Sequence, residues 1–140
     1  FGLAVTNYAA AIELCPSDPG LRMEAGQALA AFGRHDEAAR QYQSAVELEP
    51  DQAQPHMQLG FELGRLGKPA LAEQEFRQAL RLDPNLIDAR IDLGVALYEQ
   101  EKLDDALKQF EDVLQRNPND ATSLRYVQRL RNRTSLPAGR

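Results

Sequence analysis

The sequence predicts an all-α fold in which antiparallel pairs of helices stack side by side into a solenoid. Three observations support this prediction. A proline recurs every 34 residues, at Pro16, Pro50, Pro84 and Pro118. Ala, Leu, Glu, Gln and Arg dominate the composition, and all of them are favourable in helices. No segment shows the alternation of apolar and polar β-branched residues that is typical of a strand. A repeat of this length is typical of stacked supersecondary units.

Other positions keep the same interval of 34 residues. Small residues at such positions allow two helices to approach at the short end of the roughly 8–10 Å range. Aromatic residues are then expected to fill the space between the helices, because a two-helix unit cannot bury its apolar faces alone. The recurring positions are Gly26, Gly60 and Gly94; Leu29, Leu63 and Leu97; Ala38, Ala72 and Ala106; and Tyr42, Phe76 and Phe110.

Each unit is expected to hold two amphipathic helices. In the last complete unit the apolar periodicity predicts helices over about 87–100 and 104–116, separated by EKLDD. Gly33 and Gly67 mark the same turn in the two earlier units, and Glu101 takes their place in the last. Pro118 cannot continue a helix, so it ends the unit.

The phase of the repeat sets the expected domain organisation. Residues before the first complete unit match only the second helix of a unit, and the segment after the last unit is helical but more polar, as a capping helix is. We expect a repeat domain over 1–132 and a basic tail or linker over 133–140. Within the domain we expect a truncated unit at 1–18, complete units at 19–52, 53–86 and 87–120, and a capping helix at 121–132.

Each unit of 34 residues has the same order: a glycine after a small or apolar residue, then Leu, Ala, an aromatic residue and Pro. This pattern resembles the tetratricopeptide repeat (TPR) family over about residues 1–120. The resemblance implies a right-handed superhelical α-solenoid with the first helix of each pair on its concave side. It also implies a protein-interaction function. The position that frequently holds Trp in the family holds Arg22, His56 and Arg90 here.

The first helices predict a partner-binding groove on the concave side. Methionine adapts to irregular partners, and Phe61 and Tyr98 add apolar surface, while acidic residues surround it. We therefore expect a groove for a helix or extended segment with apolar anchors and basic residues. Packing between adjacent first helices is an equally good interpretation of Met57, Ile91 and Val95. The predicted groove residues are Met23, Glu24, Gln27, Met57, Gln58, Phe61, Arg65, Asp88, Ile91, Asp92, Val95, Tyr98 and Glu99.

One ligand class of the resembled family is not expected here. Members that clamp the carboxylates of a chaperone C-terminus do so with Lys, Asn, Asn, Lys and Arg on three successive first helices. The last two of these positions hold Asp88 and Asp92, so two cations are replaced by two anions. Reversing an attractive pair near a surface changes the interaction by several kcal/mol. The five matching positions are Met23, Gln27, Gln58, Asp88 and Asp92.

The sequence gives no sign of catalytic chemistry. His35 and His56 lack the spacing of a metal site and are expected to be exposed or partly packed, and the single cysteine, Cys15, has no partner for a disulfide or a cysteine-built zinc site. Acid pairs such as Asp104–Asp105 and Glu111–Asp112 are expected on solvated outer faces, and nothing indicates the buried, perturbed carboxylates that acid–base catalysis needs. We expect no enzyme, no catalytic residue, no cofactor and no metal.

Charge and hydropathy exclude further classes of partner. The first 120 residues hold 11 basic and all 21 acidic side chains, a net charge of −10, whereas residues 121–140 hold five arginines and no acid. The acidic body disfavours nucleic acid. No apolar run approaches the roughly 18 residues of a membrane span. The compartment stays undetermined, with the cytoplasm slightly favoured.

The favoured function is a protein–protein interaction module or scaffold. Because the chain begins with Phe1 in the middle of a unit, we expect it to be a fragment of a larger protein. Two alternatives stay open: a regulatory or targeting arm of a larger enzyme such as a transferase, and a self-assembly element. In the second, the truncated N-terminal face, with Leu3, Val5 and Ile12, forms homo-oligomers.

Overall fold

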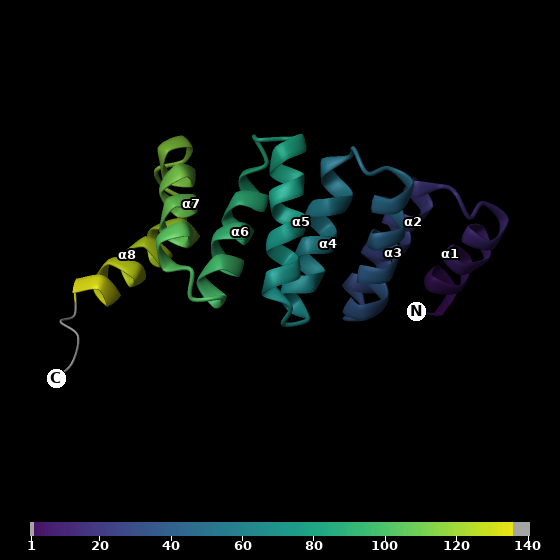
Figure 1. The fold of residues 1–140 in the computed structure, drawn as a ribbon. Helices are drawn as coiled ribbons and strands as arrows, with labels where there is room; N and C mark the ends of the chain where they lie inside the picture. The colour runs from purple at the N-terminus through teal and green to yellow at the C-terminus, as the bar shows by residue number, and fades with distance from the viewer. Residues whose placement is uncertain (1, 136–140) are drawn as a thin grey trace.

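A computed structural model describes residues 2–135 and, within these, the side chains of residues 6–133. The described residues form α-helices without a strand, joined by short turns, and the helices follow one another in a single extended row (Figure 1). The helices are α1 (Gly2–Leu14), α2 (Pro19–Ala31), α3 (His35–Leu48), α4 (Ala53–Arg65), α5 (Pro69–Leu82), α6 (Ile87–Glu99), α7 (Leu103–Arg116) and α8 (Ala121–Ser135).

Each helix packs against its neighbours in the chain, so that α2 with α3, α4 with α5 and α6 with α7 form three helix pairs. The predicted all-α architecture of stacked pairs is confirmed. The helices predicted over 87–100 and 104–116 end and begin within one residue of α6 and α7. The three first helices of the pairs, α2, α4 and α6, occupy equivalent places along the row.

The C-terminal helix extends further than the sequence predicts. Helix α8 continues to Ser135, beyond the predicted end at 132, and an ion pair of 3.0 Å between Arg133 and Glu101 fastens the added turn to the α6–α7 turn. Residues 136–140 of the predicted tail lie outside the described residues. The buried stripe of α8 consists of Ser123, Val127 and Leu130.

The turns within the pairs explain why two of them carry glycine. Gly33 and Gly67 have φ of +72° and +70°, in the left-handed region that favours glycine, and Glu101 takes the same conformation with φ +59°. The non-glycine residue costs the backbone of this turn roughly 1–2 kcal/mol. The expected role of these positions as turn residues is confirmed.

The core runs between the pairs in two clusters. One surrounds Tyr42 on α3, and the other surrounds Phe76 and Phe110 on α5 and α7. Each aromatic ring lies directly against the glycine of the preceding helix, because that glycine has no side chain to hold the ring away.

The self-assembly hypothesis concerns the face of α1. The side chains of Leu3 and Val5 on this helix lie outside the described residues, and Ile12 is half-buried.

Three residues hold consecutive units together, and they lie at the position that is frequently Trp in the family. Arg22, His56 and Arg90 each reach the carbonyl oxygen of the proline that ends the preceding unit, at 3.2, 3.0 and 3.2 Å. His56 is therefore buried, which corrects the expectation of an exposed or partly packed side chain. Its Nδ1 lies 2.7 Å from the carboxylate of Glu75, so only a ring with hydrogens on both nitrogens donates to both partners. The second contacts of the three residues go to Gln41, Glu75 and Gln109.

This clamp predicts that His56→Arg is tolerated and His56→Ala is not. Arginine makes the equivalent contacts in the two other complete units, so we expect the free energy of unfolding to stay within about 1 kcal/mol. Alanine leaves the carboxylate of Glu75 without its buried donor, and we expect a loss of about 2–3 kcal/mol. Urea denaturation followed by circular dichroism measures both variants. Equal losses for the two would show that the clamp contacts contribute nothing.

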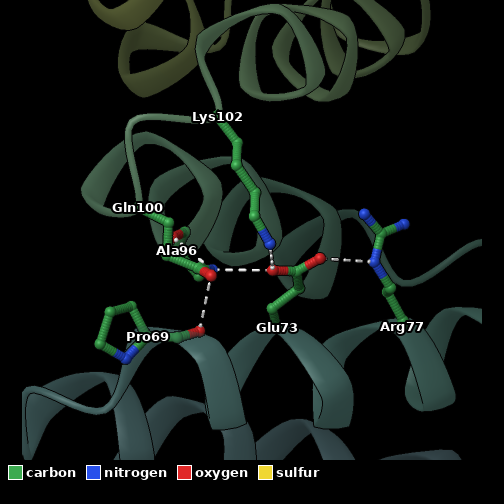
Figure 2. Close-up of polar contacts among 6 residues, drawn as sticks. All are labelled: Pro69, Glu73, Arg77, Ala96, Gln100 and Lys102. Carbon is green, nitrogen blue, oxygen red and sulfur yellow. Dashed lines mark hydrogen bonds and ion pairs between the residues drawn. The ribbon is translucent and has the colours of Figure 1, made fainter.

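A second polar contact joins the second and third helix pairs (Figure 2). The carboxylate of Glu73 on α5 accepts hydrogen bonds from Lys102 and Gln100 at the α6–α7 turn, both at 2.8 Å, and from Arg77 at 2.9 Å. Burial alone would raise the pKa of Glu73, but the three hydrogen bonds outweigh it and lower this pKa to about 2. Since the pKa is lowered, the contact stabilises the fold above pH 4.5 and its contribution is lost as the pH falls toward 2.

Candidate functional site

Two neighbouring hollows lie along α4 and α6. The smaller, here named the apolar cavity, has a volume of about 260 Å³, and the larger, the acidic cavity, about 470 Å³. Both share Phe61 and Asp92, so together they form one groove. The apolar cavity is lined by Phe61, Gly64, Arg65, Phe76, Asp92, Val95, Ala96 and Glu99. The acidic cavity is lined by Met57, Gln58, Phe61, Asp88, Ile91, Asp92, Asp120 and Thr122.

Helical spacing explains why these residues meet. Side chains three or four positions apart lie on one face of a helix. Met57, Phe61 and Arg65 recur at this spacing on α4, and α6 presents Asp88, Asp92, Val95 and Glu99 at the same spacing. The α7–α8 turn adds Asp120 and Thr122 at one end. One face of each of two first helices therefore faces the groove.

Nine of the predicted groove residues line the two cavities, and four do not. Met23 packs against the core around Leu29 and Tyr42. Glu24 and Gln27 are exposed on α2, away from both cavities, and Tyr98 packs edge-to-face on Tyr126 with ring centroids 5.2 Å apart. The nine that line the cavities are Met57, Gln58, Phe61, Arg65, Asp88, Ile91, Asp92, Val95 and Glu99.

Five lining residues lie outside the predicted set: Gly64, Phe76, Ala96, Asp120 and Thr122. Phe76 was expected only as a core residue, and it contributes to the apolar cavity while being almost fully buried. Asp120 carries a recognisable signal, since an Asp before a helix is a typical N-terminal cap. Its carboxylate accepts a hydrogen bond from the Ser123 backbone N–H at 2.7 Å, which holds it at the cavity's end.

The apolar lining residues pack against the core and also reach the groove. Met57, Ile91 and Val95 are half-buried against the cluster around Phe76 and also line the cavities, so the two interpretations of these residues are compatible. Phe61 is 41% exposed, and the guanidinium of Arg65 lies 5.8 Å from its ring centroid. An aromatic ring so exposed beside two hollows offers apolar surface to a partner.

Asp92 is electrostatically unusual. Burial and, to a smaller degree, the neighbouring charge of Asp88 raise its pKa from 3.8 to about 6. Within the described part of the chain no hydrogen bond or ion pair to its carboxylate is present. Asp92 was predicted at the groove, but no perturbed carboxylate was expected: the packing of α6 against its neighbours buries this one beside the groove.

The remaining ionisable candidates form ordinary structural contacts. His35 lies 2.7 Å from the buried carboxylate of Glu62 through Nδ1, and Arg65 donates to its other nitrogen at 3.3 Å. Over residues 2–135 no cluster of His, Cys, Asp and Glu has an arrangement that could hold a metal ion. No described helix is long and apolar enough to cross a membrane. Cys15 is exposed just after α1.

The stacked pairs and the groove along their first helices define an α-solenoid repeat protein. Two family models agree with this class: one described as a TPR repeat matches residues 26–67, and one described as a tetratricopeptide repeat matches residues 65–130. The chain belongs to the tetratricopeptide repeat family. The predicted resemblance is therefore confirmed.

Solved structures share this fold over most of the chain. YrrB, a TPR protein described as having an unusual peptide-binding site, is 26% identical with a TM-score of 0.86, over 95% of this chain and 69% of YrrB. MamA is 17% identical with a TM-score of 0.91, over 95% and 78%. The first TPR of Spaghetti (RPAP3), bound to the HSP90 peptide SRMEEVD, is 24% identical with a TM-score of 0.81, over 84% and 94%. No curated protein matches the sequence.

Proposed function

We propose that this chain binds a peptide or helix of a partner protein in the groove formed by the apolar and acidic cavities. The observation that carries the proposal is the pair of adjoining hollows around the exposed ring of Phe61. Apolar anchors of the partner would fill the hollows, and basic residues would meet the acidic side chains of α6. Binding of this kind is non-covalent and involves no chemistry by the chain. The same groove would serve if the chain were the targeting arm of a larger enzyme.

The charge of the groove argues against the ligand of one structural neighbour. The peptide bound to Spaghetti (RPAP3), SRMEEVD, has three acidic residues in its last four positions. In the present chain Asp88 and Asp92 occupy two positions where chaperone-binding members of the family use cations. An acidic C-terminus would meet like charge there, which costs several kcal/mol relative to the cationic arrangement. The favoured partner segment is basic rather than acidic.

Phe61→Ala tests the groove directly. The probe is a set of peptides selected by the wild-type chain from a phage-displayed library of random 16-residue peptides. We expect binding of these peptides, measured by fluorescence anisotropy, to weaken at least tenfold in the variant, because the substitution removes the ring shared by both cavities. The fold should persist, since this ring is 41% exposed.

Leu71→Ala is the matched control, because Leu71 is 47% exposed on α5 and lines neither cavity. It should bind the selected peptides as the wild type does. Selected peptides that bind Phe61→Ala with unchanged affinity would place the site elsewhere, and a library that yields no binder would contradict the proposal.

A further inference from the structure

We propose that the acidic cavity is a subsite that selects a lysine or arginine side chain of the partner segment, while the adjoining apolar cavity takes an uncharged side chain. This inference rests on the proposed function and deepens it, because it assigns one chemical class of side chain to each half of the groove. Three features of the described residues support it: the lining of the acidic cavity, the balance of charge around it, and the junction between the two cavities.

The walls of the acidic cavity suit a long amphipathic side chain. Met57 on α4 and Ile91 on α6 are half-buried on its two sides, and Phe61 adds an exposed aromatic ring. Lysine and arginine bury their methylene groups against such apolar surface and keep the charged end in a polar place. An aromatic ring near the cation adds further attraction. A volume of about 470 Å³ leaves room for the whole side chain.

The polar end of the same cavity is negative. Asp88, Asp92 and Asp120 line it, and among the residues that the structure describes no lysine or arginine does. Asp120 uses one hydrogen bond to cap α8, whereas Asp88 and Asp92 have no partner within the described residues. A cation from outside would gain two or three carboxylates at close range. A carboxylate from outside would be repelled by all of them.

The apolar cavity has a different character. Its floor consists of Phe76, Val95 and Ala96, and the charged groups at this cavity other than Asp92 are Arg65 and Glu99, one of each sign. With the shared Asp92 included, two acids and one base line this cavity, against three acids and no base in the acidic cavity, so a cation is favoured less here. An aliphatic or small aromatic side chain fits its smaller volume. Because both cavities share Phe61 and Asp92, the two side chains must come from neighbouring positions of one segment.

The state of Asp92 makes this selection sensitive to pH. Burial and Asp88 raise its pKa to about 6 in the free chain. The other charged groups facing it across the two cavities are Asp120, Arg65 and Glu99. As the pH falls through 6, Asp92 gains a proton and loses its attraction for a cation, while lysine stays charged. Affinity for a basic peptide should fall on acidification, and affinity for an uncharged analogue should not.

The experiment compares two fluorescein-labelled peptides: the tightest peptide from the library and its analogue with each lysine or arginine replaced by norleucine. Anisotropy gives their dissociation constants at pH 7.5 and 5.0 for the wild type, Asp92→Asn and the control Asp105→Asn, in which an exposed acid on α7 is neutralised. We expect the wild type to prefer the basic peptide at least tenfold at pH 7.5. The preference should drop below about threefold in Asp92→Asn and at pH 5.0, and persist in Asp105→Asn. Circular dichroism of the free variants checks their fold.

Separate outcomes overturn the subsite and the groove. An equal affinity of the wild type for both peptides, or an undiminished preference in Asp92→Asn, would overturn the cation subsite. If Phe61→Ala still weakened both peptides in that case, the groove itself would stand. Insensitivity of both peptides to Phe61→Ala would instead overturn the proposed function.

Discussion

Gly60→Leu is expected to lower the free energy of unfolding by about 3 kcal/mol or more, a large fraction of the stability of a typical domain. A Cβ atom added at Gly60 would lie 2.8 Å from Cε1 and 2.9 Å from Cδ1 of Phe76. The ring of Phe76 is 2% exposed and packed within the core cluster, so moving it aside would disrupt its contacts there. Helices α4 and α5 would have to separate, which would open the core between the second and third pairs.

Gly64→Leu is the matched control for this prediction. It lies one turn further along α4, and an added Cβ there meets nothing within 4 Å. The substitution fills part of the apolar cavity but no packed core, and leucine is the better helix former, so stability should stay within about 1 kcal/mol or increase. Urea denaturation followed by circular dichroism at 222 nm compares the two variants. Equal stability of both would contradict the close packing of Gly60 on Phe76.

Phe110→Ala is expected to cost about 3–5 kcal/mol, the range for removing a buried phenylalanine. The ring of Phe110 is fully buried, lies against Gly94, and stacks on Tyr126 with centroids 4.7 Å apart and planes inclined by 7°. Its loss therefore removes both the centre of the last helix pair and the surface on which α8 rests. We expect α8 to lose protection against amide hydrogen exchange more than α4 does.

Phe32→Ala controls for the chemistry of the substitution. Phe32 is 39% exposed at the C-terminal end of α2, so we expect a change below about 1 kcal/mol. Thermal denaturation gives the stabilities, and exchange measured by mass spectrometry gives the local protection of α8. An α8 that kept its protection in Phe110→Ala would show that its docking does not depend on this ring.

The helix pairs could be predicted because the repeat states the same packing requirement several times. A glycine and an aromatic residue at a constant interval specify one close helix contact, and the structure repeats that contact at Gly26, Gly60 and Gly94. The turn residues follow the same logic, down to Glu101 in the conformation of the glycines it replaces. Local periodicity was sufficient here because each unit contacts only its neighbours.

The groove could be predicted only in part. The periodicity identifies which side chains leave one face of a helix, but not which of them a neighbouring helix then covers. Tyr98 is covered by Tyr126 of α8, and Met23 by the core around Tyr42. Asp92, conversely, is partly buried by its neighbours, and its raised pKa follows from that burial, which the sequence pattern does not specify.

The polar contacts of Glu73 and of His35 between units could not be predicted for a related reason. Lys102 recurs as Lys68, but Ala39 and Leu66 stand at the positions equivalent to Glu73 and Gln100, so the repeat carries no signal for the contact. His35 and Glu62 pair in the same unrepeated way. Such contacts depend on the relative placement of two units, and each occurs at one junction only within the described residues.

The Glu73 contact has a mechanical consequence. A row of stacked repeats can bend, and the contacts at each interface between neighbouring helix pairs limit how far it bends there. The bonds around Glu73 brace the joint that also carries the groove, and the carboxylate keeps its charge down to a pH of about 2. The distance between the two cavities should therefore be nearly fixed. A ligand must have side chains at a matching distance, because the groove does not adjust to it.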